Sequence, residues 1–76
     1  MHRYIVMREF RARELNGPFA RTIGVGEELM LMRWAGEEHD DSAIFAVLIE
    51  GEEGGVTPGP EYEVPRPIFE DSTQPA

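Results

Sequence analysis

Glycine and proline divide this chain into segments that are too short for long helices. Its 76 residues include eight Gly and six Pro, which gather with polar residues between apolar runs. Asn16, Gly17 and Pro18 form a strong turn signal, and residues 51–60 hold four Gly and two Pro. No amphipathic pattern between these clusters is long enough to predict an extended helix. Turn clusters that separate short apolar runs favour an all-β domain of short strands.

The chain has no cysteine and little room for a large core. A domain of this length buries about 60% of the surface that its unfolded chain exposes. Neither a disulfide nor a thiolate zinc site can add stability, so the packing of a few large apolar residues must supply it. We expect one domain over residues 1–69, followed by a frayed, flexible tail over residues 70–76.

Apolar side chains alternate in the first segment, residues 3–12, which favours a strand. Tyr4, Val6, Phe10 and Ala12 fall on one parity, as the buried face of a strand requires. Several helix-forming residues in the same segment leave a helix as the alternative.

Three further runs predict strands, and the segment between the first two strands, residues 19–26, is expected to be irregular. Two prolines then end regular pairing, and Ile68 and Phe69 are expected to dock back as a single helical turn. The fold class is therefore all-β, a small barrel or curled sheet of four to five short antiparallel strands with long loops. The three further predicted strands are residues 28–35, 43–50 and 61–65.

The order of these segments resembles an SH3-like barrel over residues 4–69. That family often opens with a strand reading Ala-Leu-Tyr-Asp-Phe-x-Ala, and residues 6–12 here read Val-Met-Arg-Glu-Phe-Arg-Ala. An apolar residue, two spacers, a glycine and an acid follow in both, here from Ile23 to Glu27. Near the end, Val64 and Pro65 precede two spacers and an apolar pair. The resemblance implies a small closed sheet.

The family's proline-peptide groove needs aromatic residues at set positions. Of the groove positions, Pro65 alone matches cleanly, so the resemblance implies the fold and not the groove. The other groove positions hold Arg8, Phe10, Ala43, Ile44 and Ile68 here.

Charge is divided unevenly along the chain. The formal net charge is −8, from 15 acids and seven bases, and all seven bases are Arg. Residues 1–36 hold six Arg and four acids, whereas residues 37–76 hold one Arg and eleven acids. This balance opposes non-specific binding to nucleic acid and favours a basic partner.

The leading hypothesis is a non-enzymatic protein-interaction module that engages a basic site on a larger protein through an acidic surface. A small inhibitor or adaptor from a phage or mobile element would have this size and charge. The candidate partner-binding residues are Glu37, Glu38, Asp40, Asp41, Glu50, Glu52 and Glu53.

Two alternatives stay open. In the first, the protein is a self-assembling subunit that uses the Met30, Met32 and Trp34 stripe or an open edge of the second or third strand. In the second, it is a small nucleic-acid-binding barrel that uses arginines and a stacking ring. The residues of that second site are Arg3, Arg8, Phe10, Arg11 and Arg13.

No pattern in the sequence predicts catalysis, a cofactor or a metal. The acidic run around His39 lacks the alternate ligand spacing of a calcium loop. Gly24 and Gly26 lack the third glycine and the following helix of a dinucleotide site. The longest apolar stretch, Ala43–Ile49, is seven residues against the roughly 20 of a membrane span. We therefore expect a cytoplasmic protein that is not an enzyme.

Overall fold

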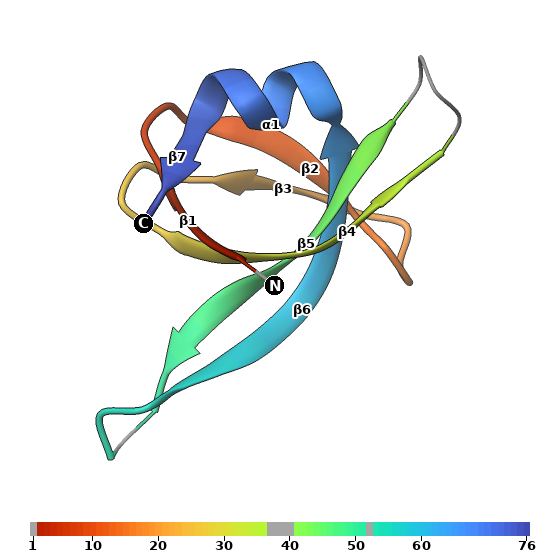
Figure 1. Ribbon diagram of the computed structural model, residues 1–76. Coiled ribbons are helices and arrows are strands. Elements are labelled where there is room, and N and C mark those ends of the chain that lie inside the picture. Colours follow the sequence, from red (N-terminus) through yellow and green to blue (C-terminus); the bar gives the residue numbers. More distant parts are fainter. Residues whose placement is uncertain (1, 37–40, 52) are drawn as a thin grey trace.

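One antiparallel sheet curls into a half-barrel, and a short helix lies across one end of it (Figure 1). The computed structural model describes residues 2–36, 41–51 and 53–76. The strand order is β3-β2-β6-β5-β4-β1-β7. In chain order the elements are β1 (His2–Val6), β2 (Phe10–Glu14), β3 (Ala20–Ile23), β4 (Glu28–Ala35), β5 (Ser42–Glu50), β6 (Val56–Pro65), α1 (Arg66–Ser72) and β7 (Thr73–Pro75).

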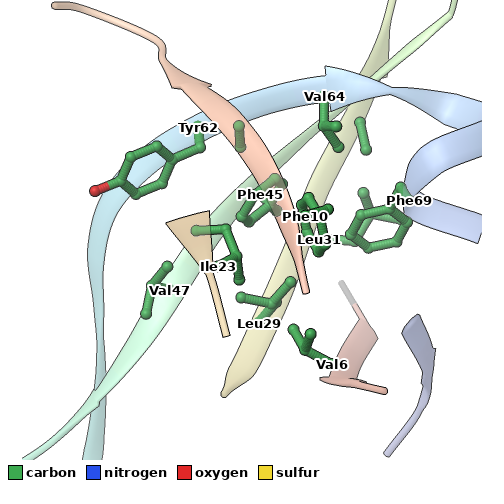
Figure 2. Packing of buried hydrophobic residues seen from close by; sticks show 12 residues of the cluster. Val6, Phe10, Ile23, Leu29, Leu31, Phe45, Val47, Tyr62, Val64 and Phe69 are labelled. Atoms are coloured by element: carbon green, nitrogen blue, oxygen red, sulfur yellow. The ribbon is translucent and has the colours of Figure 1, made fainter. Parts of the chain in front are cut away.

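The concave face of the sheet holds the core, with Phe45 at its centre (Figure 2). The Phe45 ring centroid lies 5.9 Å from those of Phe10 and Tyr62. It lies 5.8 Å from the ring of Phe69, so one side chain joins β5, β2, β6 and α1. Aliphatic side chains fill the rest of the cluster. Burial of each Val, Leu, Ile or Phe side chain contributes about 1.5–3 kcal/mol to the stability of the fold. The aliphatic side chains are Val6, Ala12, Ile23, Leu29, Leu31, Ala43, Val47 and Val64.

The all-β class predicted from the sequence is confirmed, but the described residues form seven strands rather than four to five. The segment 3–12, predicted as one strand, is two strands separated by a bend after Val6. The backbone amides of Met7 and Arg8 both donate to the carbonyl of Ser72, at 2.8 and 3.1 Å. Because Ser72 comes from the far end of the chain, local periodicity does not reveal this bend. The predicted parity was right, since the even-numbered apolar residues of the segment lie in or against the core.

Two segments expected to be irregular also contain strands. Residues 19–26 include β3, which pairs with β2 and forms one edge of the sheet. Residues 51–60 include the first half of β6, which pairs with β5 despite Pro58 and Pro60. That half of β6 has no second strand beside it in the described chain, and proline is tolerated in a strand with an open side.

The expected frayed tail was wrong. Its residues complete α1 and form β7, which pairs with β1 at the other edge of the sheet. The predicted helical docking is confirmed at Phe69, which is only 1% exposed, but was wrong for Ile68, which is 42% exposed. The helix α1 is about two turns long rather than one. Thr73 ends the helix by donating both its hydroxyl and its backbone N–H to the carbonyl of Phe69. Tertiary contacts order this segment, and its polar composition gives no indication of them.

A bulge in β4 changes which of its residues share a face. The register with β5 shifts between Leu31 and Arg33. As a result Trp34 turns toward α1, and its ring lies 5.8 Å from that of Phe69 at 89°. Met30 precedes the bulge and stays half-buried on the opposite face of the strand. The prediction that the Met and Trp side chains of this strand form one stripe was therefore wrong.

The β5–β6 hairpin continues beyond the barrel as an arm (Figure 1). The arm consists of residues 48–51 and 53–60. Pairing of β4 with β5 stops at Val47, and the arm strands pair only with each other among the described residues. At the tip, Gly51 and Gly55 are joined by a backbone hydrogen bond, and Gly54 has a positive φ of 79° that suits glycine. The arm is thus a two-stranded ribbon held by its own ladder.

Candidate interaction surfaces

The predicted acidic residues do not form one surface in the described part of the chain. Asp41 precedes β5 and Glu50 ends it, so an extended strand of roughly 30 Å separates them. Glu50 and Glu53 lie on the arm, whereas Asp41 lies beside α1 and accepts a hydrogen bond from Arg66 at 2.8 Å. The described acids therefore occupy opposite ends of β5. The other four predicted residues, Glu37, Glu38, Asp40 and Glu52, lie outside the described residues.

Three carboxylates line a hollow where the arm leaves the barrel. This arm-root hollow has a volume of about 350 Å³. Glu27 and Glu28 already pair with arginines, whereas Glu50 has no ion-pair partner within the described ranges. The hollow therefore combines an uncompensated negative charge with apolar walls. Its lining consists of Gly26, Glu27, Glu28, Leu48, Glu50 and Val56.

The residues predicted for nucleic-acid binding are scattered. Arg3 lies in β1 and Arg11 and Arg13 lie in β2, and three other strands separate β1 from β2 in the sheet. Phe10 is only 6% exposed in the core, so its ring is not accessible for stacking on a base. Arg8 is exposed in the bend between β1 and β2. Only Arg11 and Arg13 share one face of one strand.

Four of the seven arginines form ion pairs with carboxylates of the described residues. Exposed pairs of this kind contribute about 0–1 kcal/mol each to stability. Their main consequence is that local positive charge is neutralised on a molecule whose net charge is −8. The pairs are Arg3–Glu28, Arg13–Glu63, Arg21–Glu27, Arg66–Asp41 and Arg66–Glu70.

A second hollow, which we name the aromatic pocket, lies between α1 and the strands beside it. It has a volume of about 360 Å³. The ring of Tyr4 lies 5.1 Å from that of Phe69, edge to face, and Trp34 meets Phe69 in the same manner. Pro75 of β7, which pairs with Tyr4, forms part of another wall. The pocket is lined chiefly by Tyr4, Trp34, Arg66, Phe69, Glu70 and Pro75.

Arg66 places its guanidinium over the ring of Trp34, with 4.1 Å between Cζ and the ring centroid. Its Nη1 donates to Asp41 at 2.8 Å, and its Nε donates to Glu70 at 3.1 Å. The hydrogen bond to Asp41, followed by that to Glu70, raises the pKa of Arg66 above its ordinary value. The guanidinium is therefore charged and held by an aromatic face and two carboxylates.

Sequence reasoning predicted neither hollow. Tyr4, Trp34 and Phe69 come from three distant parts of the chain, and only the β1–β4 pairing and the docking of α1 bring them together. The one usable signal was Arg66 itself, which stands between two prolines where a helix begins. The arm-root hollow was hidden because residues 51–60 read as a loop rather than as a strand.

The edges proposed for self-assembly are occupied for much of their length. The strands predicted over residues 28–35 and 43–50 are β4 and β5, and both lie inside the sheet. β1 and β5 flank β4, and β4 and β6 flank β5. The outermost strands of the sheet are β3 and β7 instead.

Within residues 2–36, 41–51 and 53–76, no group of three or more acidic or imidazole side chains is arranged to hold a metal ion. The run around His39 that the sequence singled out lies outside these ranges, except for Asp41. No helix in the described chain has the length and apolar character needed to cross a membrane. In comparisons with known proteins, no family model, no curated protein and no solved structure matches this chain.

Proposed function

We propose that this protein is a non-enzymatic interaction module, built on an SH3-like barrel, that binds a basic site on a larger protein through its arm. The observation that carries the proposal is the arm with its root. A hairpin with no flanking strand in the described part of the chain projects from a packed barrel, and its base holds three carboxylates beside Leu48 and Val56. Such a surface suits a cationic segment with apolar residues, because both charge and apolar contact are offered together.

Electrostatics supports a basic partner rather than a nucleic acid. Four arginines are paired with carboxylates, while Glu50 and Glu53 on the arm have no ion-pair partner in the described structure. The negative field of the molecule would attract a cationic surface and speed its encounter, and it would repel phosphates. Asp41 belongs to a different site, so this proposal concerns only the contact made by the arm and its root.

The test compares three forms of the immobilised protein in one capture from a lysate of the source cells. These are the wild type, the arm variant Glu50→Gln with Glu53→Gln, and a control, Glu9→Gln with Asp71→Asn, which removes two exposed acids that belong neither to the arm nor to the lining of its root. We expect the wild type and the control to retain the same protein, which elutes as salt rises. The arm variant should retain less of it and release it at lower salt. Equal retention by all three forms, or retention that salt does not change, would contradict the proposal.

A further inference from the structure

The aromatic pocket has the chemistry of a site for a cationic side chain. The faces of aromatic rings carry negative electrostatic potential and attract guanidinium and ammonium groups. Here the rings of Tyr4 and Trp34 both meet Phe69 edge to face, in one hollow with the carboxylate of Glu70 on its wall. Aromatic faces and a carboxylate in one pocket complement a positive charge on a hydrocarbon stem.

The pocket already holds such a cation from the chain itself. The guanidinium of Arg66 stacks on Trp34 and bonds to Asp41 and Glu70, so two negative groups face one positive group. These contacts are open to water, because the side chains of Arg66 and Glu70 are 41% and 58% exposed. Arg66 therefore shows how a guanidinium fits the site, and it occupies the site without being enclosed.

The geometry points to a binding site for an arginine side chain of a partner protein, which takes the place of Arg66 on Trp34. This inference rests on the proposed function only in that the partner is basic. The partner's guanidinium stacks on the indole ring and bonds to the carboxylates of Asp41 and Glu70. Its hydrocarbon stem then lies along the apolar walls formed by Tyr4 and Pro75.

The Arg66 side chain can leave without detaching α1. The backbone amide of Arg66 donates to the carbonyl of Asp41 at 2.9 Å, a contact that does not involve the side chain. Phe69 anchors the helix in the core at 1% exposure, and Thr73 closes its end. Exchange of one guanidinium for another therefore leaves the helix and the pocket walls in place.

A short peptide tests the inference without the unknown partner. The probe is acetyl-Gly-Arg-Gly-amide, and the control is the same peptide with citrulline, which is isosteric with arginine but neutral. Binding is followed by the NMR signal of the indole N–H of Trp34, the single tryptophan of the chain. We expect the arginine peptide to shift this signal in a saturable manner and the citrulline peptide to leave it unchanged.

The partner's arginine is proposed to displace the Arg66 side chain, so the variant Arg66→Ala gives a sharper test. A site that is occupied by its own arginine binds a ligand more weakly than the same site left open. The variant should therefore bind the arginine peptide roughly three- to tenfold more tightly than the wild type. Arg11→Ala is the matched control, since it removes the same charge from an exposed position on β2 and should leave the affinity unchanged.

The opposite results overturn the inference. They are equal or weaker binding by Arg66→Ala, equal binding of the citrulline peptide, or a larger shift of the Trp34 signal by a proline-rich peptide of the same length. Should Arg66→Ala lose its fold, Glu70→Gln in the wild-type background serves instead, and it must weaken binding of the arginine peptide severalfold. The arm variant Glu50→Gln with Glu53→Gln should bind this peptide as the wild type does. The capture experiment thus tests the binding role of the arm, and the peptide titration separately tests the binding role of the aromatic pocket.

Discussion

Strand β5 crosses two regions of the molecule in which the same residue type has opposite surroundings. Ile44, in the barrel, is 1% exposed, whereas Ile49, in the arm, is 50% exposed. Ile44 has Arg33 on one neighbouring strand and Glu63 on the other, and the stems of such long side chains cover apolar surface. Within the residues that the structure describes, Ile49 is paired with Thr57 alone. Burial in this sheet thus depends on flanking strands rather than on the hydrophobicity of the residue.

The comparison distinguishes the barrel, which is held by contacts among many elements, from the arm, which is held by local pairing. In the barrel, contacts around Phe45 join residues from four elements, and we expect these four elements to unfold together. The arm has one ladder and few buried side chains, and such regions open at a lower free energy than the core. A ribbon of this kind adapts to a partner while the barrel holds its base in place.

The largest effect should come from Phe45→Ala, which tests whether the barrel is one unit. Removing a buried aromatic side chain costs about 3–5 kcal/mol. A 76-residue domain has a total free energy of unfolding of about 4–11 kcal/mol, so this single change would remove from about a third to all of its stability. Urea unfolding followed by Trp34 fluorescence measures the change. A loss below about 1 kcal/mol would show that the rings around Phe45 do not act together.

A matched pair of substitutions on β5 tests the comparison itself. Ile44→Ala should lower the free energy of unfolding by about 2–5 kcal/mol, as expected for a buried isoleucine. Ile49→Ala should lower it by less than about 1 kcal/mol, because half of that side chain remains in water. Denaturant unfolding of both variants under one set of conditions provides the measurement. Similar losses in the two variants would mean that the arm unfolds with the barrel.

The core residues could be predicted from the sequence, and several elements could not. Alternation placed Val6, Phe10 and Ala12 on one buried face, and β4 and β5 lie where the apolar runs are. Alternation is local, so it carried no information on the bend held by Ser72. It also missed the bulge that turns Trp34, since the bulge depends on pairing between two strands.

The sites were harder to predict than the fold, for a related reason. The clustering of acids along the chain predicted one acidic surface. However, the extended strand β5 lies between Asp41 and Glu50 and holds them at its opposite ends. The aromatic pocket needs Tyr4, Trp34 and Phe69 together, and only the complete topology provides that. Alternation within a strand predicted which residues are buried in β1 and β2, whereas the assembly of side chains from distant segments had no sequence signal.

A glycine of the arm should give a smaller loss than the core substitutions at Phe45 and Ile44, and it sharpens the boundary between the barrel and the arm. A Cβ at Gly59 would lie 2.8 Å from the carbonyl oxygen of Val47 and 2.7 Å from Cδ1 of Ile49. The backbone oxygen cannot move without shifting β5, so Gly59→Ala should cost about 1–3 kcal/mol through overpacking. Unfolding in urea measures this cost. Gly55→Ala is the control, because, apart from its two chain neighbours, no atom of the described residues lies within 4 Å of its added Cβ.

Hydrogen exchange on the same two variants shows whether Gly59→Ala destabilises the arm alone or the barrel as well. Gly59 faces the point at which β5 leaves the barrel, so its substitution disturbs the arm from its base. Amides of Ile49 and Thr57 should exchange faster in Gly59→Ala than in Gly55→Ala, while that of Phe45 keeps its protection relative to global unfolding. If the amide of Phe45 lost as much protection as those of Ile49 and Thr57, the boundary between the barrel and the arm would lie further out along the arm. The arm would then be an extension of the barrel, and its freedom to adapt to a partner would be lost.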